Sequence, residues 1–136
     1  MIAAYQPLPS EPGSNELLAE LVGMGYRVIV PVTLPDRDLD WIDWHADATP
    51  APQLGLAAIA KAALVLVPAF AVDLSGHRLG RGGGSYDRAL TRVDASTPVA
   101  ALLYQEELLA EVPVDDWDLP VSSVVTPDGW LELGGG

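Results

Sequence analysis

The sequence predicts an α/β protein, a three-layer αβα sandwich around a mostly parallel, Rossmann-like sheet. Three observations lead to this class. Apolar runs of strand length alternate with segments of helical character along the chain. Two of these runs, 26–32 and 63–67, are apolar almost throughout, which is typical of strands covered on both faces. The 136 residues, 49% of them hydrophobic, suffice for one core, so we expect a single domain over residues 1–136.

The chain is predicted to begin with a strand and a helix. Residues 2–5 form a short apolar strand, and a loop rich in proline follows it. Asn15 can cap a helix that ends near Gly23 or Gly25. The side chains expected on the apolar face of this helix are Leu17, Leu18, Leu21 and Val22.

Two further strands complete the first half. The run 26–32 is a strand with Pro31 near its end, because proline cannot donate a hydrogen bond within a central ladder. Residues 38–44 alternate apolar side chains with acids, so we expect a more exposed strand there.

The second half continues the alternation after a linker that contains Pro50 and Pro52. A short helix is expected at 57–62, and the clearest strand of the chain follows at 63–67. The later elements should be a helix at 85–93, a strand at 99–104, and two strands at 123–126 and 130–133 that close the sheet.

The charge of the chain is unevenly distributed. Its 7 Lys+Arg against 19 Asp+Glu leave a net charge of −12, which argues against nucleic acid and anionic membranes as partners. Four of these few basic residues nevertheless lie close together, at Arg78, Arg81, Arg88 and Arg92. The sequence has no cysteine, which excludes disulfides and thiolate metal sites and suits a cytoplasmic protein.

The segment 78–88 predicts an anion site. Its glycines let backbone N–H groups approach a phosphate closely, and the helix expected at 85–93 would turn its N-terminal end toward the same anion. Asp87 could hold a magnesium ion that bridges phosphate oxygens. The alternative interpretation is a flexible glycine turn whose arginines lie in solvent.

Polar residues follow several of the predicted strands. In open parallel sheets, ligands bind beyond the carboxyl ends of the strands. This rule gathers near one crevice the residues Gln6, Glu11, Asp73, Tyr104 and Gln105 and the acidic run 115–118.

The run Leu66-Val67-Pro68, then Asp73, Gly76 and the segment 78–88, resembles the signature of the 5-formyltetrahydrofolate cyclo-ligases, also called methenyltetrahydrofolate synthetases. The resemblance covers almost the whole chain. It implies the cyclo-ligase version of the α/β fold and an ATP- and magnesium-dependent reaction. In that reaction ATP phosphorylates the formyl oxygen of 5-formyltetrahydrofolate, and ring closure then yields 5,10-methenyltetrahydrofolate.

The resemblance also implies roles for individual residues. The ATP phosphates would be held by Arg78, Leu79, Gly80, Arg81, Gly82, Gly83, Gly84, Ser85 and Tyr86, with Arg81 and Tyr86 as the catalytic residues. Reduced folate would contact Gln6, Glu11 and Tyr86, and magnesium would bind Asp87 and Asp118. Three of these have structural alternatives: Glu11 as a residue near a helix start, Asp118 as a solvated acid, and Tyr86 as a packing ring.

The chain departs from the family pattern in several places. Ser85 stands where a second tyrosine is common, and Trp117 and Ser122 replace a histidine and an aspartate. Family chains also usually begin with further residues, whose lysine and arginine contact ATP. A truncated sequence, a misassigned start and a divergent member with weak ATP binding each account for this difference.

Two other classes of function stay open. One is a weak or inactive paralogue that binds nucleotide or folate, and the other is a sugar-phosphate enzyme on a related fold. For the main interpretation we expect small-molecule ligands, a monomeric protein and a cytoplasmic location.

Overall fold

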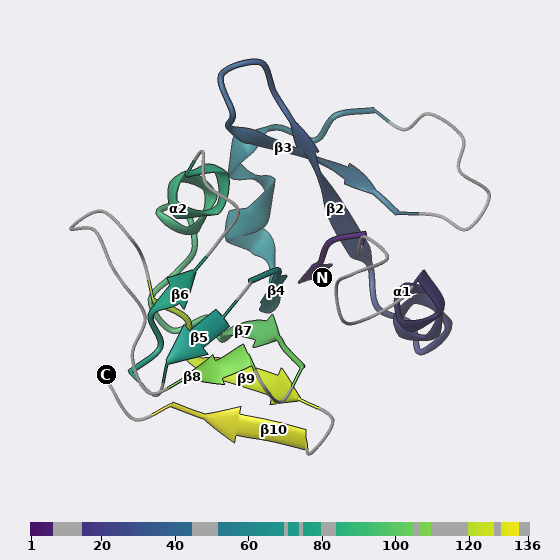
Figure 1. Cartoon of the computed structure of the whole chain (residues 1–136). Helices are drawn as coiled ribbons and strands as arrows, with labels where there is room; N and C mark the ends of the chain where they lie inside the picture. The colour runs from purple at the N-terminus through teal and green to yellow at the C-terminus, as the bar shows by residue number, and fades with distance from the viewer. Residues whose placement is uncertain are drawn as a thin grey trace.

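The computed structural model describes residues 1–6, 15–44, 52–69, 71–73, 75–79, 84–104, 107–109, 120–126 and 129–133. Within these residues the main sheet has seven strands in the order β10-β9-β7-β4-β1-β2-β3 (Figure 1). Their bounds are β1 Ile2–Ala3, β2 Val28–Thr33, β3 Leu39–Asp43, β4 Leu64–Val67, β7 Val99–Leu102, β9 Ser123–Thr126 and β10 Gly129–Glu132.

The central strands of this sheet are parallel. β1 pairs in parallel with both β2 and β4, β4 with β7, and β7 with β9. Only the two outer strands run the other way, β3 beside β2 and β10 beside β9. The predicted mostly parallel sheet is therefore confirmed, and the closing pair of strands forms an antiparallel hairpin.

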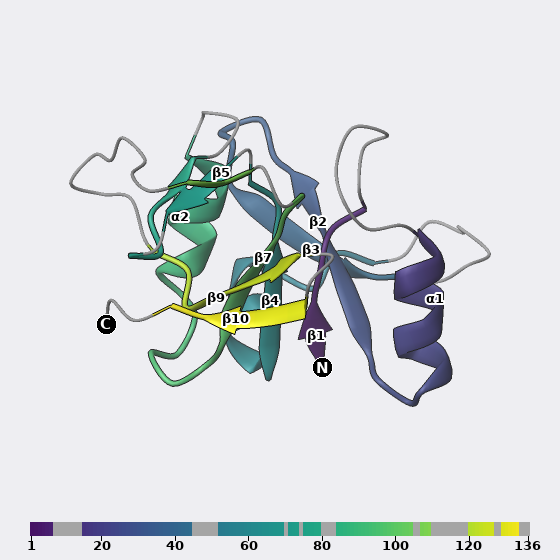
Figure 2. The same cartoon turned by 60° about the horizontal axis from the view of Figure 1, so that its bottom comes forward.

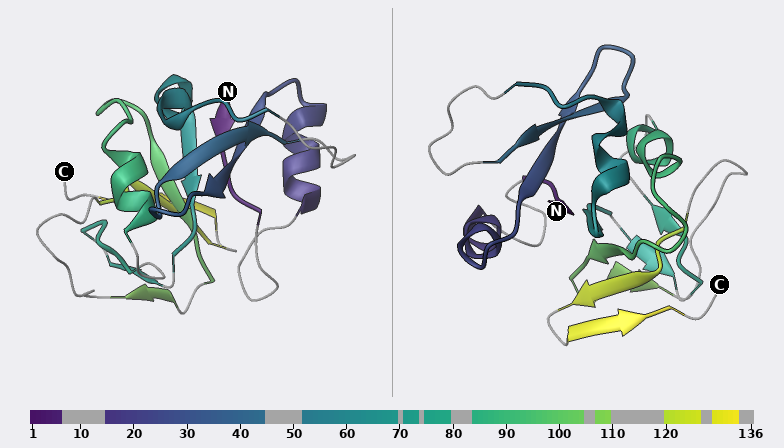
Figure 3. Two further views of the ribbon diagram at one scale, coloured as in Figure 1. Left: turned by 90° about the horizontal axis from the view of Figure 1, so that it is seen from above. Right: turned by 180° about the vertical axis from the view of Figure 1, so that it is seen from behind.

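Helices cover the two faces of the sheet, as Figure 3 shows. The helix α1, Asn15–Gly23, packs on one face, where Leu18 joins side chains such as Ile2 and Val28. The 3₁₀ helix η1, Leu56–Lys61, and the helix α2, Ser85–Leu90, lie over the other face. Because side chains alternate along a strand, Ile2 and Ala3 point into different halves of the core. This arrangement confirms the α/β sandwich.

The strand β3 is less exposed than the sequence predicted. Leu39 and Trp41 are 2% and 0% exposed, because η1 and α2 pack against this strand. The acidic residues that alternate with them, Asp38 and Asp40, are also buried, and the Asp40 carboxylate accepts the backbone N–H groups of Trp41 and Gly55. Alternation of apolar and acidic side chains therefore did not indicate exposure here, since backbone donors satisfy the buried acid.

Two predicted helices differ in form. The helix expected at 57–62 is a 3₁₀ helix, and α2 ends at Leu90. Beyond Leu90 the backbone continues to Val93 in turns with hydrogen bonds between residues three apart, so the prediction of a helix to residue 93 was too long. In α1, Leu18 is buried as expected, whereas Val22 is 40% exposed.

A second, three-stranded sheet was not predicted. Its order is β6-β5-β8, with bounds β5 Ala71–Asp73, β6 Arg78–Leu79 and β8 Leu108–Leu109. Strands of two or three residues are too short to show a hydrophobic period in the sequence. This small sheet places Arg78 and Leu79 in a strand, so the glycine-rich loop begins after Leu79 and not at Arg78. Among the described residues, no helix is long and apolar enough to cross a membrane.

Candidate functional site

The candidate site lies at the carboxyl edge of the main sheet, where β1, β2, β4 and β7 end. These strands are parallel, so their carboxyl ends point the same way. The turn between β2 and β3 and the N-terminal end of α2 lie at this same edge (Figure 2). Gln6, three residues beyond the end of β1, is exposed there. Gln6 is thus at the edge where the topology rule predicted it, whereas Glu11, Gln105 and the run 115–118 lie outside the described residues.

A buried carboxylate builds the turn between β5 and β6. Asp73 is 2% exposed, and one of its oxygens accepts the backbone N–H groups of Ser75 and His77, each at 3.0 Å. Its other oxygen lies 2.9 Å from Nδ1 of His77. Asp73, one of the residues that the topology rule brought to the crevice, therefore shapes the turn that leads into β6.

Gly76 fixes this turn against the segment that enters β9. Its φ is +91°, and a Cβ built there would lie 2.3 Å from the carbonyl oxygen of Val121. The Val121 N–H donates a hydrogen bond of 2.8 Å to the Gly76 carbonyl. Only glycine fits a backbone that combines a positive φ with so close an approach.

Arg78 connects β4 to the first turn of α2. One terminal nitrogen donates to the carbonyl of Pro68, just after β4, at 3.3 Å, and the other lies 3.4 Å from an Asp87 carboxylate oxygen. The guanidinium carbon lies 5.7 Å from the centre of the Tyr86 ring. The Arg78 side chain is only 7% exposed, and its Nε is buried without a hydrogen-bond partner among the described residues.

The helix α2 begins at a glycine in the left-handed conformation. Gly84 has a φ of +68° and precedes Ser85, Tyr86 and Asp87, all of which are partly exposed. Nothing lies within 4 Å of a Cβ built at Gly84, so the backbone angle and not lack of space favours glycine there. With six residues, α2 is shorter than the helix at 85–93 whose N-terminal end was expected to face the anion.

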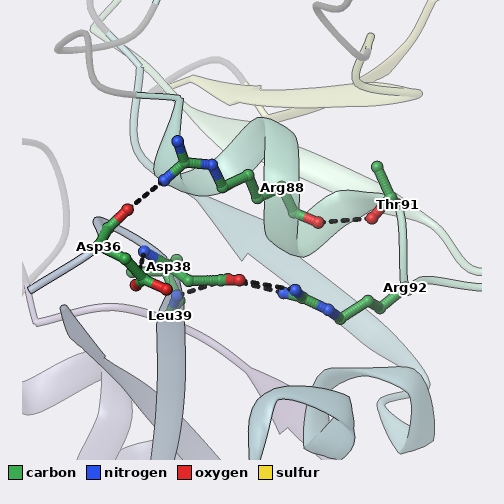
Figure 4. Close-up of polar contacts among 6 residues, drawn as sticks. All are labelled: Asp36, Asp38, Leu39, Arg88, Thr91 and Arg92. Atoms are coloured by element: carbon green, nitrogen blue, oxygen red, sulfur yellow. Dashed lines mark hydrogen bonds and ion pairs between the residues drawn. The ribbon is translucent and has the colours of Figure 1, made fainter. Parts of the chain in front are cut away.

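Arg88 and Arg92 contact the turn between β2 and β3 (Figure 4). Arg88 donates a hydrogen bond of 2.5 Å to the carbonyl of Asp36, in the turn between β2 and β3. Arg92 donates two hydrogen bonds, each of 2.7 Å, to the two carboxylate oxygens of Asp38. These bonds lower the pKa of Asp38 from 3.8 to about 2. These two arginines, which the sequence groups with Arg78 and Arg81, therefore clamp α2 to the hairpin of β2 and β3.

The residues that could hold a metal are few. Among the described residues, no group of three or more His, Asp or Glu side chains is placed to hold a metal ion. Asp87 offers one partly exposed carboxylate at the start of α2. A single carboxylate is compatible with magnesium, because proteins often hold Mg²⁺ with one or two carboxylates while substrate phosphates supply further oxygens.

The structure brings together three of the predicted site residues, Arg78, Tyr86 and Asp87. Six others lie outside the described residues: Glu11, Gly80, Arg81, Gly82, Gly83 and Asp118. The sequence did not predict that the β2–β3 turn binds Arg88 and Arg92, or that the Pro68 carbonyl accepts a hydrogen bond from Arg78. No local signal could have found the turn, because 52 and 54 residues separate the partners of its contacts with Arg88 and Arg92.

Comparison with known proteins agrees with the resemblance seen in the motif. A family model described as the 5-formyltetrahydrofolate cyclo-ligase family matches residues 1–127. A 5-formyltetrahydrofolate cyclo-ligase of Mycolicibacterium smegmatis is 39% identical over an alignment of 141 positions. The alignment covers 93% of this chain and 73% of that protein. The Escherichia coli protein of the same name is 28% identical over 140 residues, covering 93% of this chain and 77% of its own.

Solved structures show the same relationship. The NMR structure of Aquifex aeolicus 5,10-methenyltetrahydrofolate synthetase has a TM-score of 0.78 at 26% identity, and the match covers 99% of this chain and 72% of that one. A 5,10-methenyltetrahydrofolate synthetase from Mycoplasma pneumoniae shares the fold, with a TM-score of 0.74 at 22% identity.

Proposed function

Because the chain belongs to the 5-formyltetrahydrofolate cyclo-ligase family, we propose that it converts 5-formyltetrahydrofolate to 5,10-methenyltetrahydrofolate with ATP and magnesium. The observation that supports this most is the position of Tyr86 and Asp87. They follow the glycine-rich loop directly and lie in the first turn of α2, at the carboxyl edge of the sheet. A ligand site is expected at this edge in a sheet of this kind.

The chemistry explains why the site needs positive charge and fixed geometry. A formyl group on nitrogen is a poor electrophile, and its oxygen is a poor leaving group. Transfer of the terminal phosphoryl group of ATP to that oxygen releases ADP and converts the oxygen into part of a phosphate. The second folate nitrogen then attacks the formyl carbon, and the phosphate leaves. Such phosphoryl transfer depends mainly on positioning and on neutralisation of charge.

In this proposal the phosphates bind the loop, through the backbone of Gly80, Gly82, Gly83 and Gly84 and the side chain of Arg81. Leu79, Ser85 and Tyr86 border the loop on either side. Glycines and a guanidinium are suited to this task, because both present N–H donors to phosphate oxygens.

Reduced folate contacts Gln6, Glu11 and Tyr86, and Asp87 with Asp118 holds the magnesium ion. When bound, Mg²⁺ neutralises charge that develops on the phosphate oxygens. Of these residues, Gln6 is exposed and Tyr86 and Asp87 are partly exposed at the carboxyl edge, which is compatible with contact to ligands. A monomeric state and a cytoplasmic location stay predictions.

The reaction can be followed by absorbance. 5,10-Methenyltetrahydrofolate has an extended amidinium chromophore in the near ultraviolet that 5-formyltetrahydrofolate lacks. We expect this absorbance to appear only when protein, ATP and Mg²⁺ are all present. In calorimetric titrations, Arg81→Ala should weaken MgATP binding by about 1.5–3 kcal/mol, the value of a charge-assisted hydrogen bond. Arg88→Ala is the matched control, because its guanidinium contacts the Asp36 carbonyl.

The outcomes separate the alternatives. Binding of both folate and ATP without formation of the chromophore would point to an inactive paralogue that binds these ligands. If neither ligand bound, the family relationship would hold for the fold alone, and sugar phosphates would be the next ligands to test. Equal MgATP affinity of Arg81→Ala and the unchanged protein would remove Arg81 from the site.

A further inference from the structure

We propose that Arg37, in the turn between β2 and β3, binds the carboxylates of the glutamate tail of reduced folate. The inference rests on the proposed function, because it concerns a further part of the same substrate. It gives a role to a residue outside the glycine-rich segment, to which the motif assigned none. With this contact, the protein is selective for folates that keep their tail.

Arg37 has an unusual backbone conformation. Its φ is +71°, and among the described residues only glycines share a positive φ with it. Glycine, asparagine and aspartate adopt this left-handed region more easily than arginine does. The turn is nevertheless well formed, since the Leu34 N–H donates to the Asp38 carbonyl and the Arg37 N–H to the Leu34 carbonyl, each at 2.8 Å. Non-glycine residues held in this region are found preferentially where a protein binds a ligand.

The guanidinium of Arg37 is available to a ligand. Its side chain is exposed and makes no hydrogen bond or ion pair within the part of the chain that the structure describes. The two neighbouring acids are already engaged: an Asp36 carboxylate oxygen accepts the Asp38 N–H at 2.9 Å, and both Asp38 oxygens bind Arg92. In a chain of net charge −12, an exposed arginine without an acidic partner is suited to an anion from outside.

The order of the strands places this turn beside the proposed folate contacts. β1 lies next to β2, and the Ala4 N–H donates to the Ile29 carbonyl, so the chain that leaves β1 toward Gln6 runs along β2. Gln6 and Arg37 are both exposed at the carboxyl edge of the sheet. The glycine-rich loop, which is proposed to hold the phosphates, instead follows β6 of the small sheet. Arg37 is therefore better placed for folate than for ATP.

The turn that carries Arg37 is also tied to α2. Arg88 binds the carbonyl of Asp36, the residue before Arg37, and it follows Tyr86 by two positions along the helix (Figure 4). Tyr86 is itself a proposed folate contact. A support that is already fixed reduces the ordering that ligand binding must impose. The hydrogen bond from Arg88 thus prepares the position from which Arg37 meets the ligand.

The glutamate tail suits such a residue. It lies at the far end of folate from the pterin ring and carries two carboxylates, to which further γ-linked glutamates add more. A guanidinium presents parallel N–H donors that match a carboxylate. The tail takes no part in ring closure, so an exposed arginine can hold it away from the reacting atoms. A phosphate of ATP offers similar chemistry, and the experiment therefore measures both ligands.

The experiment is calorimetric titration of Arg37→Gln and the unchanged protein. Arg27→Gln is the matched control, because it removes the same charge from the same hairpin at an arginine that already binds Asp43. The ligands are 5-formyltetrahydrofolate, 5-formyltetrahydropteroate, which lacks the glutamate, and MgATP. Arg37→Gln should weaken binding of 5-formyltetrahydrofolate about tenfold, as expected for one charge-assisted hydrogen bond, and leave the other two affinities unchanged. Arg27→Gln should leave all three unchanged.

The titrations distinguish the possible outcomes. Unchanged affinity of Arg37→Gln for 5-formyltetrahydrofolate would overturn the inference, and so would an equal loss for both pterin ligands, since the tail would then not be the group that is bound. A loss confined to MgATP would make Arg37 a phosphate ligand instead. If the unchanged protein binds 5-formyltetrahydrofolate but forms no methenyl chromophore, the proposed function fails, whereas a selective loss in Arg37→Gln still supports the inference. Absence of any folate binding would overturn both.

A second variant separates binding from folding. Arg37→Asn removes the charge but keeps a residue that tolerates the left-handed conformation. We expect its thermal unfolding midpoint to equal or exceed that of the unchanged protein, together with the same tenfold loss of affinity for 5-formyltetrahydrofolate. A lower midpoint with unchanged folate affinity would show that Arg37 serves the fold and would contradict the inference.

Discussion

The two ends of α2 both lie beside an arginine–aspartate pair, but the geometries differ. At its start, Arg78 lies 3.4 Å from one oxygen of Asp87 and also contacts the carbonyl of Pro68. Past its end, Arg92 binds both oxygens of Asp38 at 2.7 Å (Figure 4). A bidentate ion pair at this distance fixes the helix to the hairpin, because both hydrogen bonds are short and charge-assisted. A single long contact is better suited to a carboxylate that must also bind a ligand.

This difference shows what clustering of charge in a sequence can and cannot indicate. The same residue types, a few positions apart, serve a proposed ligand site at one end of the helix and a structural clamp at the other. The roles depend on which partners the fold supplies to each guanidinium. The clamp fixes α2 to the hairpin of β2 and β3.

The comparison is tested most strongly by removing one carboxylate from each pair. Asp87→Asn should lower the rate of methenyltetrahydrofolate formation by about a hundredfold or more at limiting Mg²⁺, because the amide keeps the shape but loses the charge that stabilises the metal. Asp38→Asn should leave this rate near that of the unchanged protein. Circular dichroism would verify that both variants fold. A similar loss of rate in both would mean that the two pairs do not differ in function.

The backbone near the start of α2 offers a second test, on stability. Gly76→Ala should destabilise the protein by at least about 2 kcal/mol, because the new Cβ meets the Val121 carbonyl and the residue keeps a positive φ. Gly84→Ala should cost only about 1 kcal/mol, since it meets no atom and suffers from the backbone angle alone. Urea unfolding of both variants would measure the difference. Equal costs would mean that the β5–β6 turn is not held tightly against Val121.

The smallest effect is expected in the acid dependence of the clamp. Arg92 lowers the pKa of Asp38 in the folded protein from 3.8 to about 2. Its stabilisation is therefore complete above about pH 4 and is lost as the pH falls toward 2, because the unfolded state then binds the proton more readily. The difference in unfolding free energy between the unchanged protein and Asp38→Asn should shrink over this range. A difference independent of pH would show that the pair does not stabilise the fold through its charge.

Much of the main sheet could be predicted from local patterns. The apolar runs at 63–67 and 99–104 contain β4 and β7, and the run at 26–32 overlaps β2, which ends at Thr33. These runs stand out because a strand covered on both faces must be apolar on both. The order of these strands and helices also led to the parallel arrangement and to its carboxyl edge as the place for a ligand. The motif around Tyr86 and Asp87 identified the family without any structure.

The tertiary structure decided the rest, because it depends on contacts between residues far apart in the chain. The acids of β3 look exposed in the sequence, yet Asp40 is buried with backbone donors from Trp41 and Gly55. Arg78 looks like a loop residue beside glycines, yet a two-residue strand and the end of β4 surround it. A charged side chain in a sequence carries no information about its distant partners. The sequence by itself therefore determined most elements of the main sheet and the family to which the chain belongs. Only the packing of α2 on the main sheet, beside the β2–β3 turn, decided which charges hold the fold and which lie at the proposed site.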